Sequence, residues 1–220
     1  MSIIETRNVF HPTCHDSAVI RCLLSGRVWE KKIVTIFEQY LNPEDIAIDC
    51  GAYIGSHSIV LSNLCEKVYA FEPTPLIFGC LSKTIEHKQI NNIVLHNIAL
   101  SNKIGEDYIF TSGNGDSSLS GIRHNEEIRF KEKHLVNLNL LDNVIPATSI
   151  DAIKLIKIDC EGSEWNVVAG ADQIIEKSRP IIIIESWKNK KNANKLNEFC
   201  VKYNYISTHI TGDNFLLKPK

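Results

Sequence analysis

The feature that most constrains this chain is residues 46–57, where a short apolar run ends in an acid and two glycines follow. Asp49 stands near the end of the run, and Gly51 and Gly55 form a turn before a helix-compatible stretch. A strand, a glycine turn and a helix in this order are typical of nucleotide-type sites, where the backbone approaches a ligand closely and glycine permits it. The segment therefore predicts a ligand site at the carboxyl end of a strand.

The glycine spacing discriminates between nucleotide ligands. Dinucleotide sites use G-x-G-x-x-G to hold a pyrophosphate at a helix N-terminus. This chain has D-x-G-x-x-x-G, with one glycine fewer, and its Asp49 is expected to point into the site. A carboxylate repels a phosphate but attracts a sulfonium cation. The spacing therefore favours S-adenosylmethionine (SAM) as the ligand and makes an NAD-dependent oxidoreductase the least favoured enzyme class.

A second acid supports this interpretation. Residues 68–72 predict a strand that ends in Glu72, about twenty residues beyond the first motif, and Pro73 and Pro75 stop it there. In doubly wound folds, an acid at this place accepts hydrogen bonds from both ribose hydroxyls of a nucleoside. We therefore expect Glu72 to bind the ribose.

Strand and helix signals alternate from residue 45 to about 203, which predicts an α/β fold with a mainly parallel sheet. The run Ile-Ile-Ile-Ile-Glu at 181–185 is typical of a central strand buried on both faces. A terminal antiparallel hairpin around Thr-Gly-Asp is how class I methyltransferase-like (Rossmann-like) sheets finish. The expected strands are 46–50, 68–72, 93–100, 155–160 and 181–185, the expected helices are 56–65, 75–87, 164–177 and 191–203, and the hairpin strands are 205–210 and 214–218.

The chain of 220 residues predicts one domain with two parts. Residues 1–45 are expected to form a helical lead-in packed on the core, because 28–41 carry apolar residues near helical spacing. Residues 46–220 are expected to form the catalytic domain. Within it, residues 101–150 are polar and weakly periodic, and 114–121 resemble a mobile loop. An insertion of this length predicts a lid or hairpin that sets specificity.

Bulk properties exclude several classes. The net charge of −2 provides no general attraction to nucleic acid or to an anionic membrane, and no apolar run has the length of a membrane span or the form of a leader. The seven cysteines are scattered and odd in number, which favours buried thiols in a reducing, cytoplasmic location. No metal site is expected, because His11, Cys14 and His15 lack a second half-site.

The third motif, residues 155–164, carries the chemistry. Side chains alternate across a strand, so Lys157, Asp159 and Glu161 are expected on one face. Ionisable groups in an apolar strand are costly to bury without partners, so they are expected at its carboxyl end, facing a cleft. The structural alternative is an ion pair between Lys157 and a carboxylate, with an acid that caps the next helix.

Taken together, these motifs resemble the FkbM family of SAM-dependent O-methyltransferases. The resemblance is carried by D-x-G-A-x-x-G, F-E-P, K-I-D-x-E-G-x-E and P-I-I-I-I-E, and it runs from about Gly26 to Pro219. The K-x-D-x-E-G-x-E segment is the most specific. Tyr53 stands where family members commonly carry asparagine, but the glycine spacing is kept. The resemblance implies methylation of a hydroxyl on a sugar, a glycan or a small natural product.

The motifs and the resemblance imply roles for particular residues. Asp159 is the first choice for general base or substrate orienter, Glu161 is next, and Lys157 is expected to tune the pair. Glu185 is expected to complete an acidic wall, and His57 is a weaker candidate for the base. The expected cofactor-binding residues are Glu30, Asp49, Gly51, Ala52, Tyr53, Gly55, Ser56, His57, Glu72, Pro73, Ala99, Ser101, Ser117 and Asp159.

Two other functions stay open. Lys157 and Asp159 resemble part of the Lys-Asp-Lys-Glu grouping of RNA ribose 2′-O-methyltransferases, and a basic cluster lies between Lys188 and Lys195. RNA binding should show a broader basic face with stacking aromatic residues, which the balanced charge disfavours. A SAM-binding partner protein without catalysis is disfavoured by the intact polar groups of every motif. The acceptor and the oligomeric state are left open.

Overall fold

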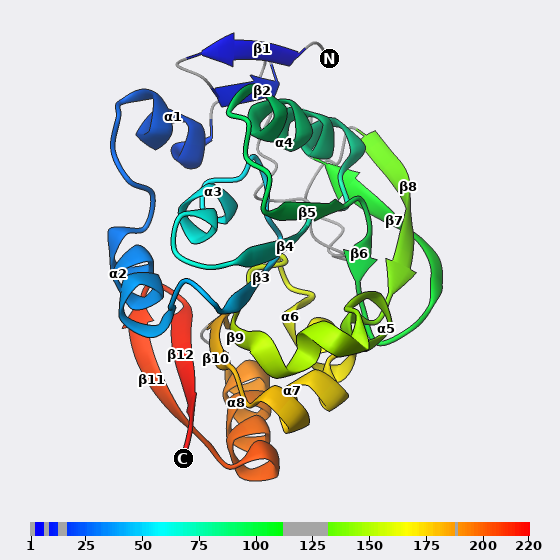
Figure 1. Ribbon diagram of the computed structural model, residues 1–220. Helices are drawn as coiled ribbons and strands as arrows, with labels where there is room; N and C mark the ends of the chain where they lie inside the picture. Colours follow the sequence, from blue (N-terminus) through cyan, green and yellow to red (C-terminus); the bar gives the residue numbers. More distant parts are fainter. Residues whose placement is uncertain (1–2, 7–8, 13–16, 112–131, 188) are drawn as a thin grey trace.

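A seven-stranded mixed sheet forms the centre of the protein in the computed structural model, which describes residues 3–6, 9–12, 17–111, 132–187 and 189–220 (Figure 1). The strands from β10 to β5 run parallel, and β12 and β11 close the sheet in antiparallel order. The predicted mainly parallel sheet with a C-terminal antiparallel hairpin is confirmed. In spatial order the strands are β11 (Tyr205–Thr211), β12 (Asn214–Pro219), β10 (Ile181–Glu185), β9 (Ile153–Ile158), β3 (Ile46–Cys50), β4 (Lys67–Phe71) and β5 (Ile93–His96).

The chain changes direction across the sheet between β3 and β9. From β3 it proceeds to β4 and β5 on one side, and from β9 to β10 on the other, although β3 and β9 are paired neighbours. In this register Asp49 of β3 stands beside Lys157 of β9. Ligands of open α/β sheets bind outside the carboxyl ends of the strands at such a switch point. The topology therefore brings the first and third motifs of the sequence together.

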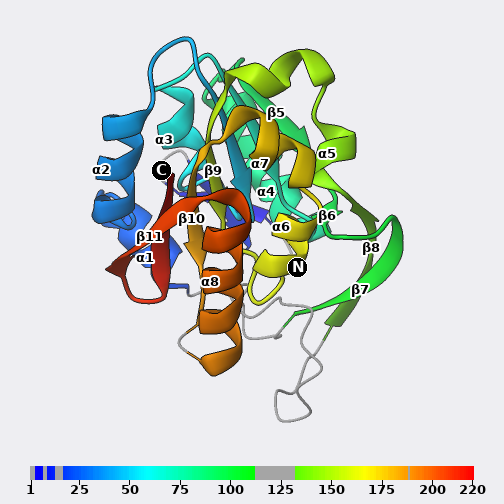
Figure 2. The ribbon, with the colours of Figure 1, turned by 90° about the horizontal axis from the view of Figure 1, so that it is seen from below.

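Helices cover both faces of the sheet, which explains its apolar strands (Figures 1 and 2). Ile182 of β10 packs in one layer and Ile183 in the other, so β10 is the predicted strand buried on both faces. None of the described helices is both long and apolar enough to cross a membrane. One layer contains α2 (Lys31–Tyr40), α3 (Ser58–Ser62) and α4 (Pro75–His87), and the other contains α5 (Leu141–Val144), α6 (Glu164–Ala169), α7 (Asp172–Ser178) and α8 (Lys190–Tyr203).

The lead-in is helical only in part, so that element of the prediction is wrong. Strands β1 (Ile3–Thr6) and β2 (Val9–Pro12) pair antiparallel before α1 (Ala18–Leu24). They lie over α4 (Figure 1), where the Phe10 N–H donates to Thr84 Oγ1 at 3.0 Å. Strands this short are stabilised by pairing and docking, which the helical spacing of the neighbouring sequence does not reveal.

The segment predicted as an insertion builds a second sheet. It has three strands, in the order β6 (Ala99–Leu100), β8 (Glu132–Asn139) and β7 (Gly105–Thr111), and a 3₁₀ helix (Ala147–Ala152) leads back to β9. The single strand expected at residues 93–100 is therefore two strands in different sheets. The predicted loop 114–121, with Ser117, lies outside the described residues.

The single helix expected at residues 164–177 is also wrong, because α6 and α7 are separate. The break falls at Gly170, where an added Cβ would lie 2.1 Å from the Ser101 carbonyl oxygen. The carboxylate of Asp142 then accepts the N–H groups of Gln173 and Ile174 and caps α7. Contacts from distant segments therefore end one helix and start the next.

Gly51 fixes the turn that follows β3 against the end of β9. Its φ is +84°, and an added Cβ would lie 1.8 Å from the carbonyl oxygen of Asp159. The turn is held on the other side by N–H groups of Gly51 and Ala52 that donate to the Phe71 carbonyl. Gly51 is therefore required by packing between strands as well as by its backbone conformation.

We expect Gly51→Ala to lower the free energy of unfolding by roughly 3 kcal/mol, because overlap with backbone is added to left-handed strain. The matched control is Gly26→Ala, since Gly26 has φ +77° and nothing within 4 Å of its added Cβ. That variant should lose only about 1 kcal/mol. Urea denaturation measures both values, and equal losses would contradict the packing argument.

Candidate active site

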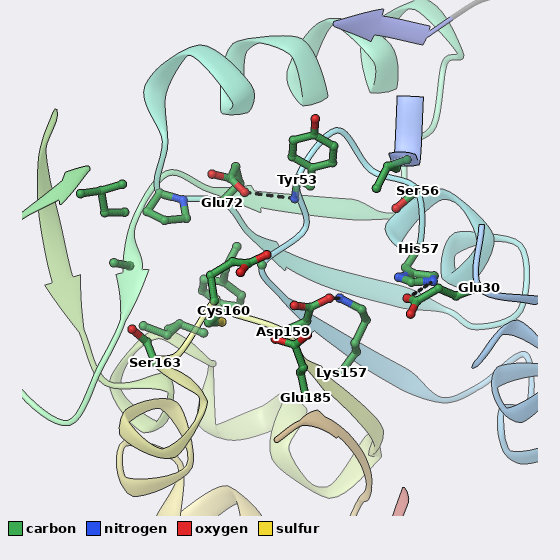
Figure 3. Close-up of a pocket in the computed structure, with 18 of the residues that line it drawn as sticks. Glu30, Tyr53, Ser56, His57, Glu72, Lys157, Asp159, Cys160, Ser163 and Glu185 are labelled. Atoms are coloured by element: carbon green, nitrogen blue, oxygen red, sulfur yellow. Dashed lines mark hydrogen bonds and ion pairs between the residues drawn. The ribbon is translucent and has the colours of Figure 1, made fainter. Parts of the chain in front are cut away.

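A cavity of about 230 Å³ opens at the carboxyl ends of the parallel strands, at the switch point between β3 and β9 (Figure 3). Its lining divides into two kinds of surface. One part is apolar and comes from Phe71, Ile98, Ala99, Leu100 and Ile109. The other part is strongly acidic and comes from Glu30, Glu72, Asp159, Glu161 and Glu185. The cavity can therefore offer apolar contacts to a flat ring and acidic contacts to a cationic or hydroxyl-bearing group.

Glu72 follows β4 and lies beside the glycine turn. Its Oε2 accepts the Tyr53 N–H at 3.0 Å, and its Oε1 accepts the Thr74 N–H at 2.8 Å. Burial raises the pKa of Glu72 to about 7, although these N–H groups act in the opposite direction. Its carboxylate is thus held in one orientation at the cavity wall, where the sequence predicted a ribose-binding acid.

Three residues of the lining have a left-handed backbone without being glycine. Their φ angles are 46° at Glu30, 53° at Tyr53 and 51° at Glu161. Such conformations cost free energy and persist where the surrounding structure enforces them. For Tyr53 the restraints include the Glu72 contact and a hydroxyl that donates to Ser17 Oγ at 3.0 Å. Tyr53 thus joins the glycine turn to the start of α1.

Lys157 is buried between two carboxylates at the junction of β3 and β9. Its Nζ lies 3.3 Å from Asp159 Oδ2 and 3.6 Å from Asp49 Oδ1. Burial opposes its charge, but Asp159, Asp49 and Glu30 outweigh burial and raise the pKa of Lys157. Lys157 therefore stays charged and compensates the acids around it.

Asp49 does not face the cavity, so the prediction of its orientation is wrong. It is fully buried, and its Oδ2 accepts the Ser58 hydroxyl at 2.6 Å. Its Oδ1 forms the ion pair with Lys157 inside the protein. In the third motif, Lys157 forms the ion pairs of the structural alternative, and Asp159 also lines the cavity.

Glu30 and His57 form a second polar group beside Lys157 (Figure 3). Their nearest atoms, Glu30 Oε2 and His57 Nε2, are 3.6 Å apart. Burial, with the charge of Lys157, holds the pKa of His57 well below its ordinary value, whereas burial raises the pKa of Glu30. The contact is therefore between a neutral imidazole and an acid. Asn214 of β12 donates to Glu30 Oε1 at 3.2 Å, which ties the C-terminal hairpin to the cavity.

The structure gathers most of the predicted site residues. Ala52, Gly55 and Ser101 do not line the cavity: Ala52 and Ser101 are buried, and an added Cβ on Gly55 would lie 2.7 Å from Leu81 of α4. Ser117 lies outside the described residues. Those in the lining are Glu30, Gly51, Tyr53, Ser56, His57, Glu72, Pro73, Ala99, Lys157, Asp159 and Glu161.

Sequence reasoning missed several lining residues that come from other elements. The cap of α1 contributes Ser17 to the cavity lining, α1 itself contributes Val19, and β12 contributes Asn214. No local pattern distinguishes them, since their place depends on how the termini pack. Phe71 was detectable, because it immediately precedes Glu72 at the end of an apolar strand.

Comparison with known proteins identifies the family. The model of the methyltransferase FkbM domain matches residues 49–207, which is most of the chain. The chain belongs to the FkbM methyltransferase family. The family whose motifs the sequence resembles is therefore confirmed.

Two curated relatives of this FkbM domain have names that state a methylation reaction. The 2-O-methyltransferase NoeI of Sinorhizobium fredii is 25% identical over 163 residues, which cover 68% of this chain and 65% of that protein. The hexuronic acid methyltransferase AglP of Haloferax volcanii is 23% identical over 172 residues, which cover 76% of this chain and 67% of that protein. The chain thus spans about two thirds of the length of these relatives.

Solved structures support the fold. The methyltransferase FkbM from Methylobacillus flagellatus matches with a TM-score of 0.57 and 18% identity, over 91% of this chain and 52% of that one. SMU.1697c from Streptococcus mutans, solved in complex with SAH, matches with a TM-score of 0.53 and 14% identity, over 85% of this chain and 94% of that one. These likenesses establish the class I methyltransferase fold for the FkbM domain described here.

We expect Lys157→Met to lower the free energy of unfolding by about 3–5 kcal/mol, because Asp49 would be left buried without its cation. Asp49→Asn added to this variant should recover part of the loss. The control is Lys177→Met, whose partner Asp151 is 3.1 Å away with both side chains exposed. That change should cost less than about 1 kcal/mol. Chemical denaturation compares the three variants, and similar losses for Lys157 and Lys177 would refute the buried ion pair.

Proposed function

We propose that this protein is an O-methyltransferase that transfers the methyl group of SAM to a hydroxyl of a sugar, a glycan or a small natural product. The observation that carries the proposal is the division of the cavity. The cavity has apolar lining residues, among them Phe71 next to Glu72, and acidic lining residues that include Asp159, Glu161 and Glu185. The name of the relative from Sinorhizobium fredii supports transfer to oxygen, and the name of the relative from Haloferax volcanii supports a sugar acid as the acceptor.

The residues present fit SAM. Glu72 would accept hydrogen bonds from the ribose hydroxyls, and the apolar residues near Ile98 would pack on the adenine. Gly51, Tyr53, Ser56 and His57 would surround the methionine part. The acids attract the sulfonium charge, and SAM supplies an electrophilic methyl group when bound.

Asp159 would orient the acceptor hydroxyl. It follows β9 directly at the switch point, and its ion pair with Lys157 fixes the carboxylate at the cavity wall. Methyl transfer to oxygen is an in-line displacement, so much of the rate enhancement comes from holding the hydroxyl close and aligned. Lys157 keeps Asp159 in place and compensates its charge, and Glu161 would contact the same acceptor from the turn after β9.

An RNA acceptor is disfavoured by the same charges. Among the described residues, five acids line the cavity around Lys157, which is already paired, so a polyphosphate chain would be repelled. The basic residues that raised the RNA hypothesis include Lys190, Lys191 and Lys195, which lie on α8, and Lys188, which is outside the described residues.

We expect the purified protein to bind SAM with micromolar affinity in calorimetry, and Glu72→Ala to weaken binding by at least about tenfold, because charge-assisted hydrogen bonds to the ribose are lost. Glu86→Ala, on the exposed side of α4, is the control and should bind like the wild type. Titration with NAD should show no binding.

Transfer of a radiolabelled methyl group from SAM to methyl glycosides of hexoses and hexuronic acids tests the acceptor class. Product formation supports the proposal. Binding of SAM without transfer to any hydroxyl would instead favour a non-catalytic SAM-binding protein, and transfer to RNA in the same assay would favour the 2′-O-methyltransferase alternative.

A further inference from the structure

Glu185 occupies a position that the roles described so far do not use. It is the last residue of β10, next to β9 in the sheet, and it lines the cavity. Figure 3 shows its side chain rising toward Asp159 from the wall opposite Glu72 and Tyr53. After burial, the charge of Asp159 is the next largest cause of the raised pKa of Glu185. Glu185 therefore faces the space where an acceptor hydroxyl oriented by Asp159 would lie.

Trp187 holds Glu185 in this place. The indole Nε1–H donates to Glu185 Oε2 at 3.0 Å, and no other hydrogen-bond partner of the Glu185 carboxylate is found among the described residues. The indole ring lies on Gly162, where an added Cβ would be 2.9 Å from Cη2 of Trp187. Gly162 has φ +103° and follows the left-handed Glu161. The turn after β9 and the end of β10 are thus coupled through one aromatic side chain.

The other acids near the cavity are more heavily committed to partners. Asp159 is paired with Lys157, and both oxygens of Glu72 accept backbone N–H groups. Glu164 of α6 accepts the N–H groups of Cys160 and Gly162 through Oε1 and is buried. Glu185 differs from Asp159 because it forms no ion pair among the described residues, and from Glu164 because it lines the cavity. Its described hydrogen bond engages Oε2 and leaves Oε1 available to a hydroxyl.

The electrostatic setting of Glu185 suits proton transfer near neutral pH. Burial first, then the charges of Asp159 and Glu164, raise its pKa to about 7, against the opposing effects of Trp187 and Lys157. The adjacent residue of β12, Asn214, is neutral. A general base works best when its pKa lies near the working pH, because it is then both ionised and basic.

We propose that Glu185 is the general base of the reaction, that Trp187 is its positioning residue, and that Asp159 orients the acceptor. This inference rests on the proposed function. The acceptor oxygen forms a bond to the methyl carbon while the carbon–sulfur bond breaks and its electron pair stays on sulfur. The hydroxyl proton passes to the free oxygen of Glu185, which becomes a neutral carboxylic acid and later releases the proton to water.

The first test uses the protein without substrates. In a Trp29→Phe, Trp165→Phe background, Trp187 is the remaining tryptophan, because the chain has three. Its fluorescence should titrate with a midpoint near pH 7 as Glu185 ionises. Glu185→Gln should abolish this transition, whereas Glu198→Gln, an exposed acid on α8, should leave it unchanged. A transition that persists in Glu185→Gln would overturn the inference.

The second test measures methyl transfer to a hexoside or hexuronoside at saturating SAM, so that ionisation of Glu72 does not limit the rate. Glu185→Gln should lower kcat by about 100-fold or more and remove the fall in rate below pH 7, with the dissociation constant for SAM unchanged. Trp187→Phe removes a donor that favours the carboxylate, so this fall should move to higher pH by about one pH unit.

The outcomes separate the two proposals. If Glu185→Gln turns over as fast as the wild type and has the same pH profile, Glu185 is not the general base, but the proposed O-methyltransferase function is unaffected. If Asp159→Asn loses the pH dependence of the rate and Glu185→Gln keeps it, the general base is Asp159 instead. A wild type that binds SAM but methylates no hydroxyl refutes the proposed function and this inference with it.

Discussion

The buried charge of Lys157 connects the stability of the sheet to the chemistry of the cavity. It lies where β3 and β9 pair across the switch point, with Asp49 on one side and Asp159 on the other. Removing one charge from such a cluster leaves another charge buried without a partner. The stability lost in this way is larger than the stability that the whole ion pair adds relative to apolar residues in its place. Because side chains alternate along an extended chain, Lys157 and Asp159 lie on the same face. The ion pair between them therefore also holds the Asp159 carboxylate at the cavity wall.

The charge of the cavity depends on whether Glu72 and Glu185 are ionised, and a bound ligand changes that ionisation. Burial raises the pKa values of both Glu72 and Glu185 to about 7, so neither is fully ionised at neutral pH. A cation that enters the cavity favours the ionised form of each. Binding of a sulfonium donor and ionisation of the acids are therefore thermodynamically linked. In a protein built this way, the donor would help to generate the carboxylate that takes up the acceptor's proton.

The two ends of the chain contribute to a site that the central motifs define. Ser17 bonds the Tyr53 hydroxyl from the cap of α1, and Asn214 of the C-terminal hairpin bonds Glu30. Tyr53 and Glu30 both have left-handed backbones, which are stable when neighbouring groups hold them. The lead-in and the hairpin thus restrain strained residues of the cavity in addition to covering the sheet. A sheet of the same topology with different termini would present a different cavity wall.

The sequence by itself determined the fold class, the family and most of the residues that gather at the carboxyl ends of the strands. These depend on local periodicity, glycine spacing and alternation within one strand. The isoleucine run at 181–185 and the acid at 72 are such signals. Tertiary structure alone decided that Asp49 turns inward to Lys157, that Gly170 divides α6 from α7, and that β5 and β6 belong to different sheets. It also brought Trp187 onto Gly162 beside Glu185. Each of these depends on a partner far away along the chain, and packing and charge pairing between distant segments leave no periodic trace in the segments themselves.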